Sequence, residues 1–133
     1  MQKKLPIAVV GMAGIFPGAP DIDIFWNNII NKVDSSSEVP EGRWIVEPEF
    51  MYNPEPAPDK AFSKHACLIH DDILKSIKSD LNDINIDKDI LDNLDPLFHL
   101  VLHTGKKALS NCNISTINKE RIGTVLAAIA LPT

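Results

Sequence analysis

The chain has 133 residues, of which 44% are hydrophobic and 23% are charged, and its formal net charge is −5. These values are typical of one globular domain with a core of its own, and they exclude a disordered chain. The acidic balance and the lack of lysine and arginine clusters argue against nucleic-acid binding, and no apolar run is long enough to span a bilayer.

The first predicted elements are a buried strand over residues 5–10, a loop over residues 11–20 and a helix that begins after Asp21. The strand is short, apolar, rich in β-branched residues and followed by glycine. Asp21 is a suitable N-cap. The apolar residues after it recur at helical spacing on one face, at Ile22, Phe25, Trp26, Ile29, Ile30 and Val33.

The glycines of this loop raise the question of a nucleotide site. Gly11, Gly14 and Gly18 are spaced G-x-x-G-x-x-x-G, whereas a dinucleotide fingerprint needs G-x-G-x-x-G. Phe16 and Pro17 also occupy the turn that a pyrophosphate would have to approach. We therefore interpret these glycines as requirements of turn geometry and predict no cofactor.

The same stretch allows a second interpretation, a cleaved secretory signal. Lys3 and Lys4 precede an apolar run over residues 5–16, and Gly18-Ala19 is a pair of small residues. Several residues disfavour the helix that such a run forms, namely Pro6, Gly11, Gly14 and Pro17. A small secreted protein stays open as an alternative at this point.

The middle of the chain, residues 34–60, is predicted to be an irregular proline-rich loop. It contains half of the ten prolines, at Pro40, Pro48, Pro54, Pro56 and Pro58. Flexible linkers rarely contain aromatic residues, so Trp44, Phe50 and Tyr52 suggest an ordered loop that is pinned by aromatic side chains.

The second half is predicted to hold a short strand over residues 62–69, then loop and short helix over residues 71–94. A long helix follows, with Asp95 as its cap and Pro96 at its first position. Its many apolar residues predict burial on most sides, and a buried strand over residues 122–132 closes the chain. This order of elements predicts an α/β fold with a largely parallel sheet.

The histidines and cysteines are the candidate metal ligands and nucleophiles. His99 and His103 are spaced i, i+4 on one helix, and His65, Cys67 and His70 are further donors, but the pattern places no third ligand beside the pair. Cys67 and Cys112 lack the small neighbours of a nucleophile elbow. We expect both thiols to be reduced, in a cytoplasmic protein, and we assign no catalytic, cofactor-binding or metal-ligating residue.

Three blocks of sequence resemble one enzyme family. They are "VVGMAGIFPGAPDIDIFW" followed by "EVPEGRW", then "LDPLFHLVLHTGKKAL", then "RIGTVLAAIALPT". In the same order, the β-ketoacyl synthase domain of polyketide and polyunsaturated-fatty-acid synthases begins with a strand, G-M-x-x-x-F-P-G-A, a helix with F-W, and V-P-x-x-R-W. An Asp-Pro helix and a further strand follow there. The chain thus resembles the N-terminal part of that domain, over nearly all of residues 1–133.

The resemblance implies a fold and a reaction. The fold would be the thiolase-like αβαβα layered architecture, of which residues 1–133 form an incomplete N-terminal segment. The full protein would catalyse a decarboxylative Claisen condensation. Its acyl and malonyl groups would arrive on the phosphopantetheine arm of acyl carrier protein, and it would be a homodimer with no membrane span.

The resemblance also shows departures from the family pattern. The family carries a glutamine pair after Asp-Pro, where this chain has Leu97 and Phe98, and "AFSKHACLIHDD" replaces a glycine-rich strand. The family's nucleophilic cysteine follows the strand matched by residues 122–130, so we expect this chain alone to be inactive. Without the rest of the domain it would expose sheet edges and apolar helix faces. A catalytically dead binding or scaffold module derived from a synthase is the other alternative.

Overall fold

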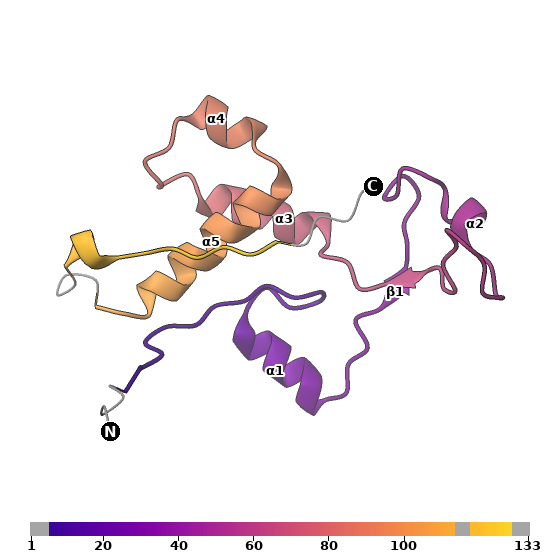
Figure 1. Cartoon of the computed structure of the whole chain (residues 1–133), viewed down its shortest axis with the longest axis horizontal. Helices are drawn as coiled ribbons and strands as arrows, with labels where there is room; N and C mark the ends of the chain where they lie inside the picture. The colour runs from indigo at the N-terminus through magenta and orange to yellow at the C-terminus, as the bar shows by residue number, and fades with distance from the viewer. Residues whose placement is uncertain (1–5, 114–117, 129–133) are drawn as a thin grey trace, which may run out of the picture.

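The computed structural model describes residues 6–113 and 118–128. The elements are, in chain order, α1 (Ile22–Ile30), β1 (Ser37–Glu38), α2 (Pro48–Met51), β2 (His65–Ala66), α3 (Asp71–Asp80), α4 (Lys88–Asn93), α5 (Pro96–Ser110) and the 3-10 helix η2 (Lys119–Arg121). Helix α3 packs along α5 in the middle of the molecule, and a lobe with β1 and α2 projects to one side (Figure 1). The described chain is therefore a mixed structure of helices and a small sheet.

Helix α1 confirms the cap and the helical spacing predicted for this stretch. The Asp21 carboxylate accepts a hydrogen bond from the backbone N–H of Ile24 at 2.8 Å, which satisfies one free donor of the first turn. The helix ends at Ile30, so Val33 lies beyond it. None of its residues is buried, and Trp26 is 59% exposed.

The hydrophobic core is small and comes from the stretch predicted to be loop and short helix. Ile77, Leu81 and Leu91 are buried together, and partly buried residues surround them: Ile15, Ile73, Ile84, Ile86, Leu94, Leu100 and Leu102. Most of these lie in or next to α3 and α4. The expectation of loop and short helix over residues 71–94 is thus met by α3 and α4, although the sequence pattern did not give the bounds of either helix.

Helix α5 confirms its predicted start but not its predicted burial. Asp95 accepts a hydrogen bond from the N–H of Leu97 at 2.8 Å, and Pro96 occupies the first turn. The buried residues of this helix are His99 and His103, whereas Leu97, Phe98, Val101 and Leu109 are exposed. The expectation of burial on most sides is wrong, because only one side of α5 packs against other described elements.

The two buried strands expected at the ends of the chain do not form in the described residues. Residues 6–10 and 122–128 are unpaired, and Ile7 and Val125 are each 96% exposed. A strand is buried only when neighbouring strands pair with it and other elements cover its faces. Leu5 and residues 129–132 lie outside the described residues.

The sheet also differs from the expected one. Strands β1 and β2 pair antiparallel, with Ser37 opposite Ala66 and Glu38 opposite His65. The described residues form no parallel sheet, although one isolated parallel bridge joins Tyr52 and Ala61. The strand predicted over residues 62–69 is reduced to the two residues of β2.

The lobe around α2 is held mainly by backbone and charged groups. The N–H of Asn53 donates to the carbonyl of Ala61 at 3.0 Å, and the N–H of Ala61 donates to Met51 at 2.8 Å. Phe50 is 71% exposed, and only Trp44 of the three aromatic residues is half-buried. The expectation that aromatic side chains hold this loop in place is therefore only partly confirmed.

Within residues 6–113 and 118–128, no helix has the length and apolar character needed to cross a membrane.

Candidate functional site

The Phe16–Ala19 turn explains one of the glycines in the first sequence block. Phe16 and Ala19 exchange two backbone hydrogen bonds of 2.8 and 2.9 Å around Pro17-Gly18. Gly18 has a φ of +69°, which suits glycine at the third position of a type II turn after proline. A Cβ at Gly18 would also lie 2.8 Å from the Ser35 hydroxyl oxygen. Glycine is required here by turn geometry, as predicted.

Both ends of the segment at residues 11–19 contact helices. The Phe16 ring stacks on Phe25 of α1, with centroids 3.8 Å apart and an interplanar angle of 16°. At the other end, the Asn111 side-chain amide donates to the carbonyl of Met12 at 2.9 Å. A Cβ at Gly11 would lie only 2.2 Å from the carbonyl oxygen of Ala108. Residues 11–19, which we call the glycine-rich clamp, therefore link α1 to the C-terminal part of α5.

A groove of about 720 Å³ lies beside this clamp. We call it the α3–α5 groove. Its walls come from the loop at residues 12–15, the start of α1, and the facing sides of α3 and α5. Its charged and imidazole side chains are Asp21, Asp23, Asp72, Asp80, His103 and Lys107.

The buried imidazole of this groove is that of His103, which is 8% exposed. Its Nδ1 lies 3.7 Å from Oδ2 of Asp80 and has no hydrogen-bond partner among the described atoms. Burial lowers the pKa of His103 below its ordinary value of 6.5, because the charged imidazolium loses hydration; Asp80 acts in the opposite direction. The two nearby lysines lower it further. His103 is therefore a neutral buried imidazole at pH 7.

Asp80 joins α3 to α5 through several contacts. Lys107 Nζ lies 3.3 Å from its carboxylate, and Lys106 Nζ donates to its backbone carbonyl at 2.6 Å. Lys106 also pairs with Asp83, and this hydrogen bond lowers the pKa of the exposed Asp83 carboxyl. These ion pairs lie at the end of α3 and hold it against α5.

The second histidine of the predicted i, i+4 pair has a different partner. His99 is buried, and its Nε2 lies 2.7 Å from the carbonyl oxygen of Leu91, at the end of the core. His99 and His103 are thus both buried on one side of α5 without sharing a ligand. In the part of the chain that the structure describes, no three His, Cys, Asp or Glu side chains are grouped to hold a metal ion.

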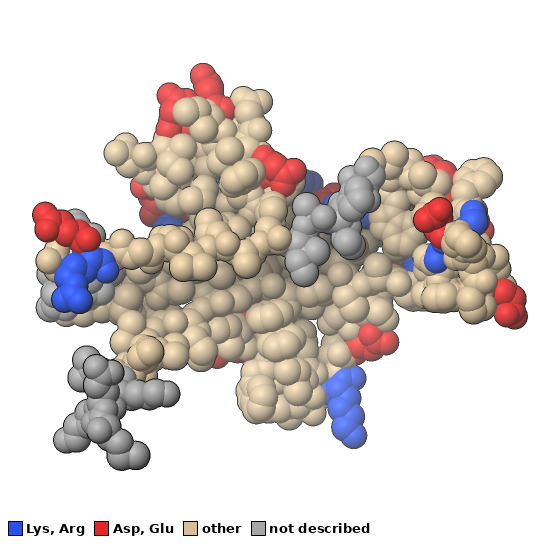
Figure 2. Space-filling model, viewed as in Figure 1, with Lys and Arg blue, Asp and Glu red and all other residues tan. Residues whose placement is uncertain are grey.

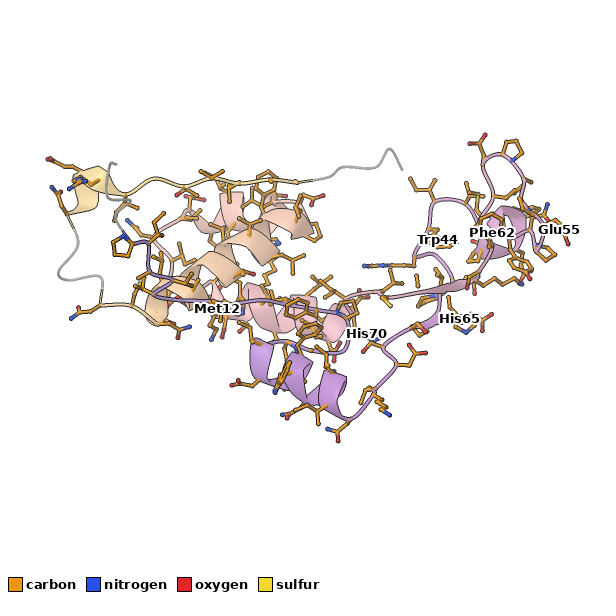
Figure 3. The ribbon with its side chains drawn as sticks, turned by 60° about the horizontal axis from the view of Figure 1, so that its bottom comes forward. Met12, Trp44, Glu55, Phe62, His65 and His70 are labelled. Atoms are coloured by element: carbon orange, nitrogen blue, oxygen red, sulfur yellow. The ribbon has the colours of Figure 1, made fainter. Side chains whose placement is uncertain are left out.

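The cysteines and the remaining histidines lie on other elements. Cys67 is an exposed free thiol just after β2. Cys112 is half-buried, and its Sγ lies 3.0 Å from the carbonyl oxygen of Leu109, to which the protonated thiol donates. Figure 3 places His65 in the lobe and His70 at the start of α3, both away from Met12. Among the described residues, no hydrogen bond joins either thiol to a histidine.

The three sequence blocks match one known protein family. The family model "Beta-ketoacyl synthase, N-terminal domain" matches residues 4–131. The chain belongs to this family. The match includes the glycine-rich clamp, α5 and the exposed segment at residues 122–128, which confirms the resemblance seen in the sequence.

Several polyketide synthases are similar to the chain. Polyketide synthase PksL of Bacillus subtilis (strain 168) is 28% identical over 127 residues, which is 93% of this chain and 3% of that protein. Polyketide synthase PksN of the same organism is 48% identical over 43 residues, 32% of this chain and 1% of that protein. Non-reducing polyketide synthase CTB1 of Cercospora nicotianae is 28% identical over 125 residues, 90% of this chain and 6% of that protein.

The chain therefore spans at most 6% of the length of these three relatives. No solved structure matches the chain.

The α3–α5 groove is the feature that sequence reasoning missed. Its residues come from three segments that are far apart in the chain, around residues 12–23, 72–80 and 103–111. The sequence signal for this groove was the i, i+4 spacing of His99 and His103, which places both histidines on one side of α5. Because the predicted short helix within residues 71–94 had no bounds, Asp72 and Asp80 could not be placed opposite His103.

Proposed function

We propose that the chain is the N-terminal part of a β-ketoacyl-[acyl carrier protein] synthase that catalyses decarboxylative Claisen condensation in polyketide or fatty-acid biosynthesis. The family match over residues 4–131 is the observation that carries this proposal. The similarity to PksL, which extends over 93% of the chain, supports the polyketide branch. In this proposal the enzyme is a cytoplasmic homodimer that receives acyl and malonyl groups from acyl carrier protein.

The exposed apolar surface supports a role as one part of a larger layered domain. The exposed apolar side chains include Ile7, Val9, Val10, Trp26, Ile30, Phe98, Val125 and Leu126. Figure 2 shows wide uncharged surface across the centre of the molecule, with acidic side chains gathered mainly at α4 and the lobe. Soluble domains seldom expose so much apolar surface without a partner for it. We infer that the remaining layers of a thiolase-like αβαβα fold cover these residues.

The proposed reaction needs a cysteine nucleophile, a role that we assign to neither cysteine of this chain. A cysteine thiolate must attack the carbonyl of the acyl thioester, form a new thioester and release the carrier thiol. Decarboxylation of the malonyl group then supplies the carbanion that attacks this acyl-enzyme, and the cysteine sulfur leaves. Cys67 is an exposed thiol just after β2, and the Cys112 thiol donates a hydrogen bond to the backbone carbonyl of Leu109. We therefore propose that the 133-residue chain holds scaffold elements and is inactive alone.

Acyl transfer tests this proposal. The 133-residue chain and the product of its complete reading frame are each incubated with an acyl thioester of acyl carrier protein, and intact masses are measured. We expect no acyl adduct on the chain and one adduct on the complete product. Cys67→Ser and Cys112→Ser variants of the chain are the controls. An adduct on the chain that either variant removes would refute its inactivity, and a complete product that stays unmodified would favour the scaffold module.

A further inference from the structure

Helix α3 is held in place by a small contact with α5. It packs on one side of α5, and Ile77 is the buried residue within the helix. Leu81, directly after the helix, is also buried, and both residues belong to the small core. A helix of ten residues is marginal in water without such packing. If α3 separated from α5, its backbone hydrogen bonds would therefore be lost as well.

The imidazole of His103 lies in this contact. His103 is 8% exposed, and its Nδ1 has no hydrogen-bond partner among the described atoms. The Asp80 carboxylate at the end of α3 lies 3.7 Å from this Nδ1, which is too far for a hydrogen bond. A neutral imidazole leaves one polar atom unsatisfied here, whereas an imidazolium would be a buried charge without a hydrogen-bonded counter-ion. The packed arrangement of α3 and α5 therefore disfavours protonation of His103.

The charged groups that act on His103 come from α3 and α5. Burial lowers the pKa of His103, Asp80 of α3 raises it, and Lys107 and Lys106 of α5 lower it. The loop at residues 12–15, which also lines the groove, has no titratable side chain. Three further carboxylates line the groove and are not among the charges that shift this pKa, those of Asp21, Asp23 and Asp72.

We propose that the packing of α3 on α5 is acid-sensitive, with His103 as the group that takes up the proton. While the imidazole is neutral, α3 stays packed and the α3–α5 groove keeps its two facing walls. When α3 separates, water hydrates the imidazole, which then binds a proton with its ordinary pKa of 6.5. Acid favours the separated state, because that state binds more protons than the packed one.

The ion pairs across the contact oppose this separation only weakly. Lys107 pairs with Asp80 and Lys106 pairs with Asp83, and the side chains of both pairs are partly exposed to solvent. Ion pairs of this kind contribute little to stability. The proposal is independent of the condensing reaction.

Hydrogen–deuterium exchange of the full protein, the product of the complete reading frame, tests this proposal. Exchange of individual peptides is measured by mass spectrometry from about pH 7.5 to about pH 5, across the titration of an ordinary histidine. The rates are corrected for the intrinsic pH dependence of amide exchange. We expect the protection of α3 to fall by up to about tenfold per pH unit, the limit for the uptake of one proton. Strands β1 and β2 should show no such fall.

Two charge variants keep the histidine and shift its pKa in opposite directions. Asp80→Asn removes the group that raises the pKa of His103, so the loss of α3 protection in acid should increase. Lys107→Met removes a group that lowers this pKa, so the loss should decrease. Both variants break the same ion pair, so a merely structural role of that pair predicts the same change in both.

Two histidine variants complete the test. His103→Leu should abolish the loss of α3 protection in acid; if this variant fails to fold, the two charge variants decide. His65→Asn is the matched control, because His65 is an exposed histidine of β2 in the lobe (Figure 3), and it should behave as the unmodified protein does. The proposal is overturned if α3 keeps its protection down to about pH 5, if His103→Leu loses it as the unmodified protein does, or if the two charge variants do not act in the stated opposite directions.

Discussion

Replacing Gly11 with alanine should separate the glycine-rich clamp from α5. The new Cβ would lie 2.2 Å from the carbonyl oxygen of Ala108 and 3.2 Å from its carbonyl carbon. Both atoms belong to the backbone of α5, so they cannot move aside as the end of a flexible side chain can. The segment that carries Gly11 must therefore shift away from the helix.

The free-energy cost comes from the interactions that this shift would break. The hydrogen bond from Asn111 to the carbonyl of Met12 has a net value of about 1 kcal/mol. Partial withdrawal of Ile15, which packs against the core, costs roughly another 1 kcal/mol. The sum of about 2 kcal/mol lies inside the range of roughly 1–3 kcal/mol seen for overpacked positions.

Urea unfolding followed by far-UV circular dichroism measures this cost. Gly105→Ala is the matched control, because it lies inside α5 with nothing within 4 Å of its Cβ position. The control should be stabilised by about 1 kcal/mol, since alanine favours a helix interior over glycine. If Gly11→Ala changes the free energy of unfolding by less than about 0.5 kcal/mol, the size of an ordinary surface substitution, the close approach to Ala108 is refuted.

Three further predictions concern His103, the aromatic stack and the cap of α5. Burial lowers the pKa of His103 in the folded chain, so the unfolded chain binds more protons at acid pH. The stabilisation is therefore present above pH 6.5 and is lost as the pH falls below that value. Urea midpoints across this range should show the loss, and His103→Leu should flatten it. Phe16 and Phe25 should show a coupling energy of about 0.5–1.5 kcal/mol in a double-mutant cycle with leucine, whereas additive effects would exclude a stack. Asp95→Ala should cost about 1 kcal/mol through loss of the cap, and Asp95→Asn should restore most of it; equal stability of all three would contradict the capping contact.

The parts of the fold that depend on local chemistry could be predicted from the sequence. Asp21 and Asp95 cap their helices as predicted, because a cap needs only a side-chain oxygen and the next few N–H groups. The Pro17-Gly18 turn is equally predictable, since only neighbouring atoms determine it.

The parts that depend on distant partners could not be predicted in the same way. Residues 6–10 and 122–128 have strand-like composition, but pairing requires neighbours that no local pattern supplies. The apolar residues of α5 predicted burial on most sides, yet α3 packs only on the side where the histidines lie. The α3–α5 groove depends on that packing. Its position follows only once α3 is known to be a helix.

The most direct test of the proposed synthase is the coding sequence beyond the codon for Thr133. The account predicts that the reading frame continues to the nucleophilic cysteine that the resemblance places after residues 122–130. Sequencing the coding DNA on that side is sufficient to measure this. An immediate stop codon would contradict the account and would leave a synthase-derived binding module without the condensing chemistry.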